Sequence, residues 1–293
     1  MDTFILGFIG FGEASYSMAK GLHGTSHPSI VAYDVMAGVG TTIKERAKEC
    51  QVRLLPTLAS LIEASDVIVC ATSAKYALSI AQEAAPFLSK GKIYADLNSA
   101  SPKIKREIAE IVDGSGALFS DCAVMEIVPP HKHRVPIAVS GSGARLCLEM
   151  LNSIGMNVTY INDQAGSSSA MKMFRSVFMK GLTSLLVETF LAAQKMGVCE
   201  QVLGSVSITL EQNSVEQLAN LLINRTAVGY ERRISEMEDV VSTLEDLDID
   251  AFASLATIER FKWMQSLELK EHLHGVVPKD FREVLDLVLE ISK

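Results

Sequence analysis

A glycine pair near the start of the chain, set between an apolar run and a helix-like segment, strongly constrains the fold. The apolar run Phe4–Ile9 leads into Gly10 and Gly12, and a second apolar run, Ile30–Tyr33, ends at Asp34. This is the layout of a βαβ unit that binds a dinucleotide. The first glycine makes the tight turn, and the second lets the backbone approach a pyrophosphate at a helix N-terminus. The acid, about 20 residues downstream, is placed to hold the adenosine ribose.

The glycine motif departs from the full fingerprint at one position. Ser15 stands where a third glycine is usual, so an ordinary glycine-containing turn between a strand and a helix is the alternative to a nucleotide site. We favour the nucleotide site because the strand, the helix and the acid are all in place. The expected cofactor contacts in this unit are Gly10, Phe11, Gly12, Glu13, Ala14 and Asp34.

The composition describes a globular chain with an acidic charge balance. Its 293 residues are 48% hydrophobic and 21% charged, with a formal net charge of −8, and this length fits one large or two ordinary domains. Without clustered Lys and Arg, such a chain is not expected to bind nucleic acid. No apolar run reaches the roughly 18 residues of a membrane span, and the first strand starts almost at Met1, which leaves no room for a targeting peptide. We expect a cytoplasmic protein that contacts no membrane.

The cysteines and histidines do not indicate a metal site. The five cysteines form no C-x-x-C pair, and because most lie in apolar segments we interpret them as buried, reduced thiols. His131 and His133 are separated by one residue in a proline-rich loop. No cluster of His, Cys and carboxylates has the spacing of zinc ligands, so we predict no bound metal.

The first half of the chain alternates short apolar runs with helical patterns. Most runs are β-branched or aromatic, and several are continuous, as in strands buried on both faces. This alternation predicts a Rossmann-type, doubly wound parallel sheet with a ligand crevice at the carboxyl ends of its strands. The predicted strands are Phe4–Ile9, Ile30–Tyr33, Val52–Leu54, Val67–Ala71, Ile93–Asp96, Leu118–Ala123, Pro136–Val139 and Val158–Ile161. The predicted helices between them include Thr57–Ala64, Lys75–Pro86 and Pro102–Val112, the last with Ser101 as its N-cap.

After about residue 162 the strand patterns stop and the chain becomes helical by period. We predict a Rossmann domain over residues 1–162 that binds NAD or NADP, and an all-helical domain for substrate binding and dimerisation over residues 163–293. A long helix is expected from about Ser167 to Gly197. The helical half is rich in Leu, Met and Val, more than a lone small bundle needs, so a homodimer is expected. Breaks between the later helices are predicted at Gly204, Gly229, Asp248–Asp250, Gly275 and Pro278.

A polar edge follows the long helix. Ser168, Lys172, Ser176 and Lys180 recur every four residues, with Arg175 beside them. The rest of the circumference is apolar, which predicts a largely buried helix. Burying an unpartnered ammonium is costly, so this edge should face a wet cleft, an anion or carboxylates. A lysine in a partly desolvated cleft suits a general base, and a solvated stripe is the alternative.

The motifs follow one another in an order that carries a family resemblance. The glycine unit is followed by Asp96–Pro102, by Asp121–Met125 and then by the helix with Lys172. This order resembles the β-hydroxyacid dehydrogenase superfamily, which includes 6-phosphogluconate and 3-hydroxyisobutyrate dehydrogenases, and the likeness covers nearly the whole chain. Three stretches resemble a less characterised branch whose helical domain is of unknown function: Val124–Pro130, Lys172–Ser176 and Tyr230–Arg233.

The resemblance implies an NAD-dependent oxidoreductase and gives each motif a role. Gly10 and Gly12 would hold the pyrophosphate, and Asp34 would select NAD; no arginine follows it to meet a 2′-phosphate, and NADP is the alternative. Lys172 matches the catalytic lysine, which takes the hydroxyl proton while hydride leaves the carbinol carbon for nicotinamide. The further implied contacts are Thr72, Ser73 and Asn98 for the cofactor and Asn98, Ser99, Ala100, Met125 and Arg175 for the substrate, with Ser176 as a second catalytic residue beside Lys172.

Two departures from the superfamily pattern bear on the substrate. The position four residues after the lysine, usually asparagine, is Ser176, whose reach is shorter. The usual Ser-Gly-Gly substrate loop is replaced by Met125–Ile127, and the glutamate in it would repel a carboxylate. Arg175, Arg232 or Arg233 could supply an anion clamp instead. The alternative for the last two is a solvated helix face.

Three functions remain open from the sequence. The first is an NAD-dependent dehydrogenase that acts on the CH–OH group of a small β-hydroxy acid or a close analogue, with Lys172 as general acid and base. The second is imine reduction or oxidoisomerisation on the same fold. The third is a nucleotide-binding protein that has lost its chemistry, which the altered Ser176 and Met125–Ile127 positions suggest.

Overall fold

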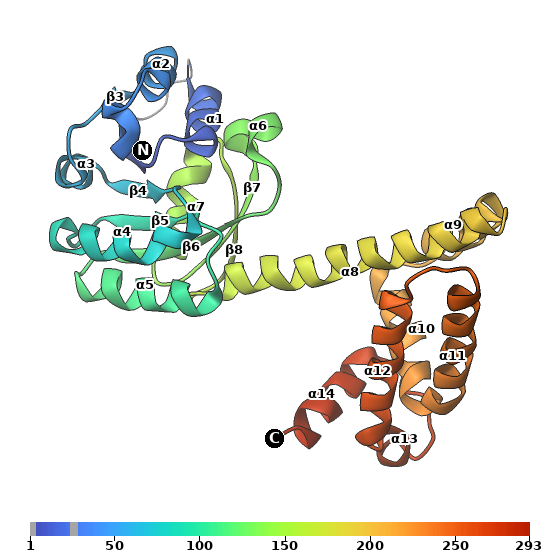
Figure 1. Cartoon of the computed structure of the whole chain (residues 1–293). Coiled ribbons are helices and arrows are strands. Elements are labelled where there is room, and N and C mark those ends of the chain that lie inside the picture. The colour runs from blue at the N-terminus through green and yellow to red at the C-terminus, as the bar shows by residue number, and fades with distance from the viewer. Residues whose placement is uncertain (1–3, 24–28) are drawn as a thin grey trace. The chain divides into compact units, whose positions relative to one another are not determined.

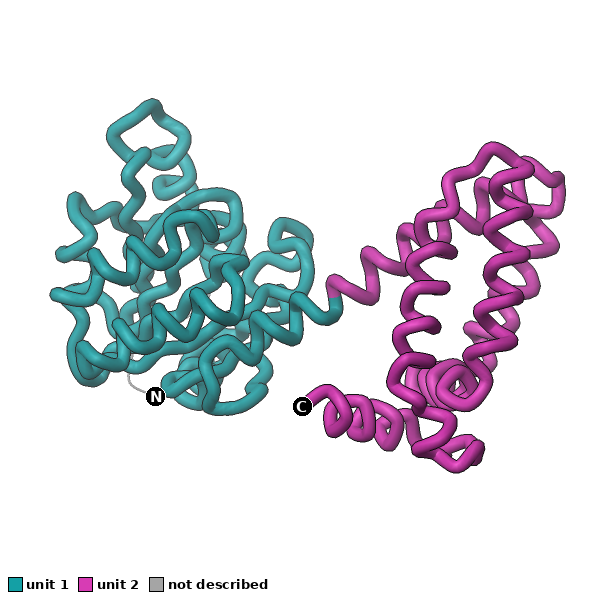
Figure 2. Tube along the Cα trace, turned by 60° about the horizontal axis from the view of Figure 1, so that its bottom comes forward, with its two compact units in different colours: residues 1–175 teal, residues 176–293 magenta. Residues whose placement is uncertain are grey.

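The structure, a computed structural model, describes residues 4–23 and 29–293 (Figure 1). The chain divides into two compact units, residues 1–175 and 176–293, coloured separately in Figure 2. The first unit is built on a Rossmann-type sheet, and the second consists of helices and their connections. The predicted fold class is therefore confirmed. The border between the two compact units lies at residues 175 and 176, inside the long helix Ser167–Lys195. The domain boundary at residue 162 stays a prediction.

One eight-stranded sheet organises the first unit, with strand order β3-β2-β1-β4-β5-β6-β7-β8. The chain adds strands outward from β1 in both directions, which is the doubly wound arrangement. All eight predicted strands are present, with ends shifted by two residues at most. Their bounds are β1 Leu6–Ile9, β2 Ile30–Tyr33, β3 Arg53–Leu54, β4 Val67–Cys70, β5 Ile93–Asp96, β6 Leu118–Val124, β7 Pro136–Ser140 and β8 Asn157–Asn162.

Alternate residues of the central strands enter two separate cores. Val67 and Val69 of β4 pack on one face of the sheet with α1, α2 and α7, whereas Ile68 and Cys70 pack on the other with α3, α4 and α5. All four side chains are at most 1% exposed. A strand buried on both faces has no use for polar alternation, which explains the continuous apolar run. The helices of this unit are α1 Glu13–Leu22, α2 Thr42–Glu49, α3 Leu58–Ala64, α4 Ala77–Ala84, α5 Pro102–Gly114, α6 Val128–His131 and α7 Ala144–Ser153.

Two strands, β7 and β8, run opposite to the other six and so depart from the predicted parallel sheet, since β8 pairs parallel with β7. β7 runs antiparallel to β6, with Asp121 opposite Ser140 and Val124 opposite Ile137. The connection between them, residues 125–135, holds only α6 and the short 3₁₀ helix η4, Lys132–Arg134. A parallel return needs a crossover of about a dozen residues or more, usually with a full helix. The chain therefore reverses direction at this edge.

The start of α5 follows the sequence prediction. The Ser101 side chain accepts a hydrogen bond from the Ile104 backbone N, and Pro102 occupies the first turn. A serine N-cap satisfies one of the donors that a helix leaves free, and proline at the first position loses no hydrogen bond. This cap fixes where α5 begins, and with it the positions of the residues on its buried face.

The second unit has a small core of its own. Ala227, Met264, Leu269 and Val284 are buried together, and partly buried side chains such as Phe261 pack around them. The helices are α9 Cys199–Glu211, α10 Val215–Val228, α11 Tyr230–Asp246, α12 Phe252–Ser266, α13 Leu269–His272 and α14 Phe281–Ile291. They are joined to the C-terminal part of α8, Ser167–Lys195.

The predicted helix breaks are correct except at one glycine. Gly229 separates α10 from α11, residues 248–250 precede α12, and Gly275 and Pro278 lie between α13 and α14. The break at Gly204 is wrong, because this residue lies inside α9. A single glycine within a helix costs only about 1 kcal/mol relative to alanine, which the surrounding helical residues outweigh.

The long helix α8 is far more exposed than its sequence predicts. In the most apolar 18-residue stretch of α8, 11% of the residues are buried. The side chains of Phe174 and Val177 are 70% and 73% exposed. The prediction of a largely buried helix is therefore wrong for the single chain. Within residues 4–23 and 29–293, α8 alone is long and apolar enough to cross a membrane by length and composition, which is weak evidence because interface helices have the same composition.

Candidate active site

The turn after β1 needs glycine at its first position. Gly10 has a φ of +85°, and a Cβ there would lie 2.7 Å from both the Ala71 carbonyl oxygen and the Thr72 Cγ2. Gly12 is the N-cap of α1, without a side-chain hydrogen bond at that end, and apart from Gly12 and its chain neighbours no described residue comes within 4 Å of the place of its Cβ. The first turn of α1, which contains Glu13 and Ala14, therefore presents backbone N–H groups to open space, as pyrophosphate sites do.

We expect Gly10→Ala to destabilise the protein and to weaken NADH binding by at least about tenfold, since the added methyl forces φ strain and a backbone shift in the turn. Gly12→Ala is the matched control, because its φ of −68° suits alanine. It should keep the melting temperature of the free protein and lose cofactor affinity alone. Thermal denaturation and NADH fluorescence measure both, and a Gly10→Ala protein with unchanged melting and binding would contradict the prediction.

The carboxylate of Asp34 is tied to the glycine turn. Its Oδ2 accepts a hydrogen bond from the Phe11 backbone N at 2.7 Å, and its Oδ1 accepts one from the Met36 backbone N at 2.8 Å. Each oxygen keeps a second lone pair, so the carboxylate can still accept from ribose hydroxyls. The Phe11 side chain is fully buried against Phe8, so this residue meets the pocket through its backbone.

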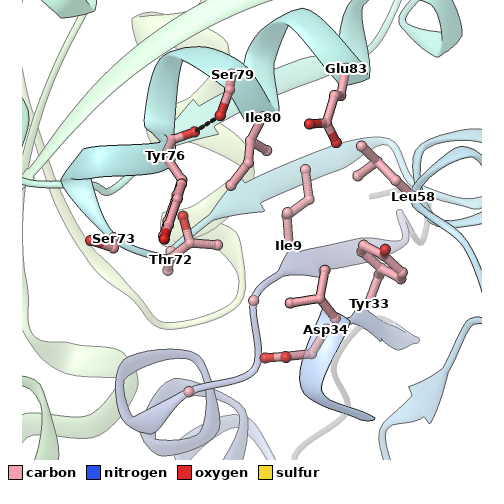
Figure 3. Close-up of a pocket in the computed structure, with 14 residues that line it drawn as sticks. Ile9, Tyr33, Asp34, Leu58, Thr72, Ser73, Tyr76, Ser79, Ile80 and Glu83 are labelled. Carbon is pink, nitrogen blue, oxygen red and sulfur yellow. Dashed lines mark hydrogen bonds between the residues drawn. The ribbon is translucent and has the colours of Figure 1, made fainter. Parts of the chain in front are cut away.

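A pocket of about 450 Å³ opens between the glycine turn and the segment after β4 (Figure 3). Gly10, Gly12 and Asp34 line it together with Thr72 and Ser73. In the view of Figure 3, Asp34 lies across the pocket from Ser79 and Glu83. The apolar side chains that line the pocket include Ile9, Val35, Leu58 and Ile80.

These features fit a nicotinamide dinucleotide. The uncapped start of α1 suits the pyrophosphate, the carboxylate of Asp34 suits the ribose, and apolar walls suit a flat base. None of the described residues that line the pocket is a lysine or arginine, whereas Asp34 and Glu83 are both acidic. The structure thus brings the predicted cofactor residues Gly10, Gly12, Asp34, Thr72 and Ser73 to one pocket.

Lys172 on α8 lies beside Ser99, as the predicted site requires. Its Nζ donates a hydrogen bond to the Ser99 Oγ at 3.2 Å. Burial lowers the pKa of Lys172 from its ordinary 10.5, and the positive charge of Lys105 lowers it further. A lysine with a lowered pKa reaches its neutral form at lower pH, so it can accept a proton as well as donate one.

Asn98 connects Ser99 to the cofactor pocket. Its Oδ1 accepts hydrogen bonds from the backbone N and the Oγ1 of Thr72, at 2.9 and 3.3 Å. Its Nδ2 donates to the Asp96 Oδ1 and to the Cys70 Sγ. These four bonds use the full capacity of the amide, and the residue is 5% exposed. Direct contacts of Asn98 with cofactor and substrate stay predictions.

The other predicted substrate residues lie on several elements, and Arg175 contacts the segment that contains Met125. Arg175 Nη2 lies 3.4 Å from Glu126 Oε1, so its charge is partly met within the protein. Met125 is half-buried, and Ala100 is buried in the core with 6% exposure. Ser176 follows in the next turn of α8, within the second unit. The roles proposed for these residues stay predictions.

A buried ionic cluster, absent from the sequence prediction, adjoins these residues. Lys105 is fully buried, with its Nζ 3.0 Å from Asp96 Oδ2 and 3.1 Å from Asp121 Oδ1. The same Nζ donates to the Asp96 carbonyl oxygen at 2.6 Å. Asp121 also accepts from the backbone N and the Oγ of Ser169, at the start of α8. We call Asp96, Lys105, Asp121 and Ser169 the anchor cluster.

The sequence held a signal for this cluster. Lys105 precedes Ile108, Ala109 and Val112 at helical spacing, so it falls on the buried face of α5. A lysine on an apolar face needs anionic partners. Asp121, in the middle of a buried strand, is such a partner.

Comparison with known proteins decides the family. Residues 5–162, more than half of the chain, match the family described as the NAD-binding domain of 6-phosphogluconate dehydrogenase. The chain belongs to this family. Residues 193–264 match a domain of unknown function, DUF1932. The predicted superfamily, its branch with a helical domain of unknown function, and a nicotinamide dinucleotide as cofactor are thereby confirmed.

Relatives of this 6-phosphogluconate dehydrogenase-like chain extend over most of its length. A conserved hypothetical protein from Sinorhizobium meliloti 1021 is 34% identical, with a TM-score of 0.67 over 89% of this chain and 88% of that chain. The conserved protein MTH1747, described as similar in structure to 3-hydroxyacid dehydrogenases, is 28% identical, with a TM-score of 0.64 over 93% of this chain and 99% of that chain. The 3-hydroxyisobutyrate dehydrogenase of Mus musculus is 29% identical over 56% of this chain and 50% of its own length.

Imine reductases share the fold of this family member at lower identity. The enzyme from Myxococcus stipitatus, solved as a variant with NAD+, is 18% identical, with a TM-score of 0.73 over 96% of this chain and 97% of that chain. At this identity the likeness concerns the fold alone.

Proposed function

We propose that this protein is an NAD-dependent oxidoreductase that transfers hydride between nicotinamide and the carbinol carbon of a small β-hydroxy acid or a close analogue. The continuity between the pocket and the lysine supports the proposal most strongly. Thr72 lines the pocket, and its backbone N is held by Asn98. The next residue, Ser99, is hydrogen-bonded to Lys172. Hydride chemistry needs a proton-transferring group close to the redox carbon, and Lys172 suits that place.

Lys172 is the proposed general acid and base. During oxidation its neutral amine takes the proton of the substrate hydroxyl, and during reduction its ammonium returns that proton to the substrate oxygen. The bound cofactor accepts or supplies the hydride. Ser99 holds the amine through its Oγ at 3.2 Å. Ser176, one turn further along α8, is the proposed second polar contact.

Imine reduction is the second candidate, because the groups that could bind a substrate anion are already bonded within the protein. The Asn98 amide is used by internal partners, and Arg175 pairs with Glu126 at 3.4 Å. A neutral or cationic substrate suits such a site better than a carboxylate, since the Glu126 charge repels anions. Lys172 would then exchange a proton with the substrate nitrogen. An oxidoisomerisation would use the same groups.

A substrate panel read by NADH absorbance tests these candidates. It contains β-hydroxy acids with NAD, and keto acids, amines and cyclic imines with NADH. Turnover of a hydroxy acid supports the first candidate, and turnover of an imine supports the second. A melting shift with NAD and no turnover on any member would overturn both and favour a non-catalytic nucleotide-binding protein.

We expect the protein to bind NADH at least about tenfold more tightly than NADPH, because the Asp34 carboxylate beside the glycine turn repels a 2′-phosphate and no lysine or arginine is among the described residues that line the pocket. Asp34→Asn should weaken NADH binding and reduce the ratio of NADH affinity to NADPH affinity, as measured by fluorescence titration. Glu83→Gln is the matched control, removing a charge from the same pocket while leaving the Asp34 carboxylate beside the glycine turn. Tighter binding of NADPH than of NADH by the unmodified protein would sink the prediction.

We propose that the apolar face of α8 is covered by a second copy of the chain in a homodimer. Val177, Phe178 and Leu191 are exposed by more than half, whereas Glu188 on the same helix is buried and accepts hydrogen bonds from the backbone N of Ala253. A buried, hydrogen-bonded carboxylate supports packing in protein rather than in lipid.

Light scattering should show a dimer, and Val177→Glu should weaken it. Binding of the protein to lipid vesicles would contradict the proposal. The cytoplasmic location stays a prediction.

A further inference from the structure

The anchor cluster joins four elements at one point of the first unit. Asp96 ends β5, Lys105 lies on α5, Asp121 lies on β6, and Ser169 is in the first turns of α8. Each of the four residues is at most 5% exposed. The predicted roles of the site do not use any of them, so this buried polar group needs its own explanation.

The charges of the cluster are closely matched to its geometry. Lys105 Nζ donates a hydrogen bond to the Asp96 carbonyl oxygen and forms ion pairs with Asp96 Oδ2 at 3.0 Å and Asp121 Oδ1 at 3.1 Å. One positive and two negative charges leave a net charge of −1. Apolar side chains of similar volume often stabilise a core as well as a buried ion pair does. The cluster is therefore better explained by the directions it fixes than by stability alone.

Hydrogen bonds lead from the cluster in two directions. On one side, the Asp96 Oδ1 accepts from the Nδ2 and the backbone N of Asn98, which in turn holds Thr72 at the cofactor pocket. On the other side, Asp121 holds the backbone N of Ser169 at 3.0 Å and its Oγ at 2.7 Å. Lys172 lies three residues after Ser169, on the same face of α8.

We propose that the anchor cluster is a positioning device, in which Lys105 locks β5 to β6 and so sets Lys172 of α8 against Ser99 and the cofactor segment. This proposal rests on the proposed role of Lys172. The cluster residues do not touch the substrate and act through Asn98 and α8. Charged groups on the elements around Lys172 include Asp96 on β5, Lys105 on α5, Asp121 on β6, Glu126 after β6 and Arg175 on α8.

The test compares three variants of the full chain. Asp121→Asn removes one charge from the cluster, and Ser169→Ala removes the hydroxyl that reaches Asp121. Ser168→Ala is the matched control: its Oγ is buried without a hydrogen-bond partner among the described residues, and its backbone N bonds to Ser140 Oγ, outside the cluster. Hydrogen exchange over residues 167–172 reports the start of α8. NMR of lysine labelled with carbon-13 at Cε follows the titration of Lys172.

We expect faster exchange over residues 167–172 in Asp121→Asn and Ser169→Ala, and wild-type exchange in Ser168→Ala. The titration midpoint of Lys172 should rise toward 10.5 in Ser169→Ala, which removes no charge, because a loosened start of α8 exposes the amine whose pKa burial now lowers. If the cluster does not position Lys172, this neutral substitution leaves the midpoint of a folded variant unchanged. Wild-type exchange and an unchanged midpoint in the folded variants would overturn the proposal. If Asp121→Asn does not fold, unchanged exchange in Ser169→Ala overturns it alone.

Neither measurement needs a substrate. If the substrate panel shows no turnover, the proposed function fails while the exchange and titration results still decide whether the cluster positions Lys172. If turnover is found, Ser169→Ala should lower kcat by at least about fivefold with NADH affinity within about twofold of wild type, since α8 starts outside the cofactor pocket.

Discussion

Replacing Lys172 with alanine is expected to lower turnover by about 100- to 10,000-fold, which is the usual contribution of a general acid or base. NADH should bind the variant normally, because the described pocket is lined without Lys172. Steady-state kinetics on the substrate found by the panel, with NADH fluorescence titration, measure both quantities. Lys180→Ala is the matched control, an exposed lysine two turns further along α8.

A loss of less than about tenfold, with NADH binding intact, would remove Lys172 from the proton-transfer step. The pH dependence gives an independent check. The pKa of Lys172 is lowered by burial first and by Lys105 second, so its neutral form appears below the ordinary value of 10.5. Oxidation, which needs the neutral amine, should rise with pH along a limb below that value, and reduction should fall along the same limb. Lys172→Ala should lose both limbs.

The second large effect is expected at Lys105. Lys105→Met should lower the free energy of unfolding by about 3–5 kcal/mol, since removing one partner of a buried ion pair leaves carboxylates without compensation. The two carboxylates involved, those of Asp96 and Asp121, are both buried in the same cluster. Chemical denaturation measures the change. Lys103→Met, at an exposed position of the same helix, should change stability little.

The stability difference at Lys105 should depend on pH in a defined direction. Burial alone would lower the pKa of Lys105, but Asp96 and Asp121 raise it above 10.5 overall. A raised folded-state pKa stabilises the protein at pH values below 10.5, and this stabilisation is lost as pH rises through the folded-state value. Denaturation curves should therefore show the full difference between wild type and Lys105→Met at neutral pH and a smaller one above pH 10.5. A difference below about 1 kcal/mol at neutral pH would contradict the ionic description of the cluster.

Much of the cofactor unit follows from local sequence. Gly10, Gly12 and Asp34 lie in one βαβ segment, where residue spacing along the chain fixes their spatial relation. The eight strands were predictable for a similar reason, since continuous β-branched runs mark strands covered on both faces. Lys172 was predicted first from the polar edge of the long helix and then from a family resemblance, and its bond to Ser99 agrees with that prediction.

Other features depend on partners that sequence spacing does not show. The direction of β7 depends on the short connection from β6. The engagement of Asn98 depends on Thr72 and Cys70, each more than 20 residues away. The exposure of α8 was not predicted, because its apolar composition favours a buried helix. Composition does not show whether the residues that bury such a helix belong to the same chain or to another one.

The sequence by itself determined the Rossmann-type unit, its glycine turn and its cofactor class, because these rest on backbone geometry and periodicity within short segments. Only the tertiary structure revealed the ionic contact between Lys105 and the two aspartates, and the link from Asp121 to Ser169, 48 residues along the chain. The physical reason is that strand register and helix packing bring such charges together. A lysine on a buried helix face indicates that an anionic partner lies nearby, and the tertiary structure shows which carboxylates pair with it.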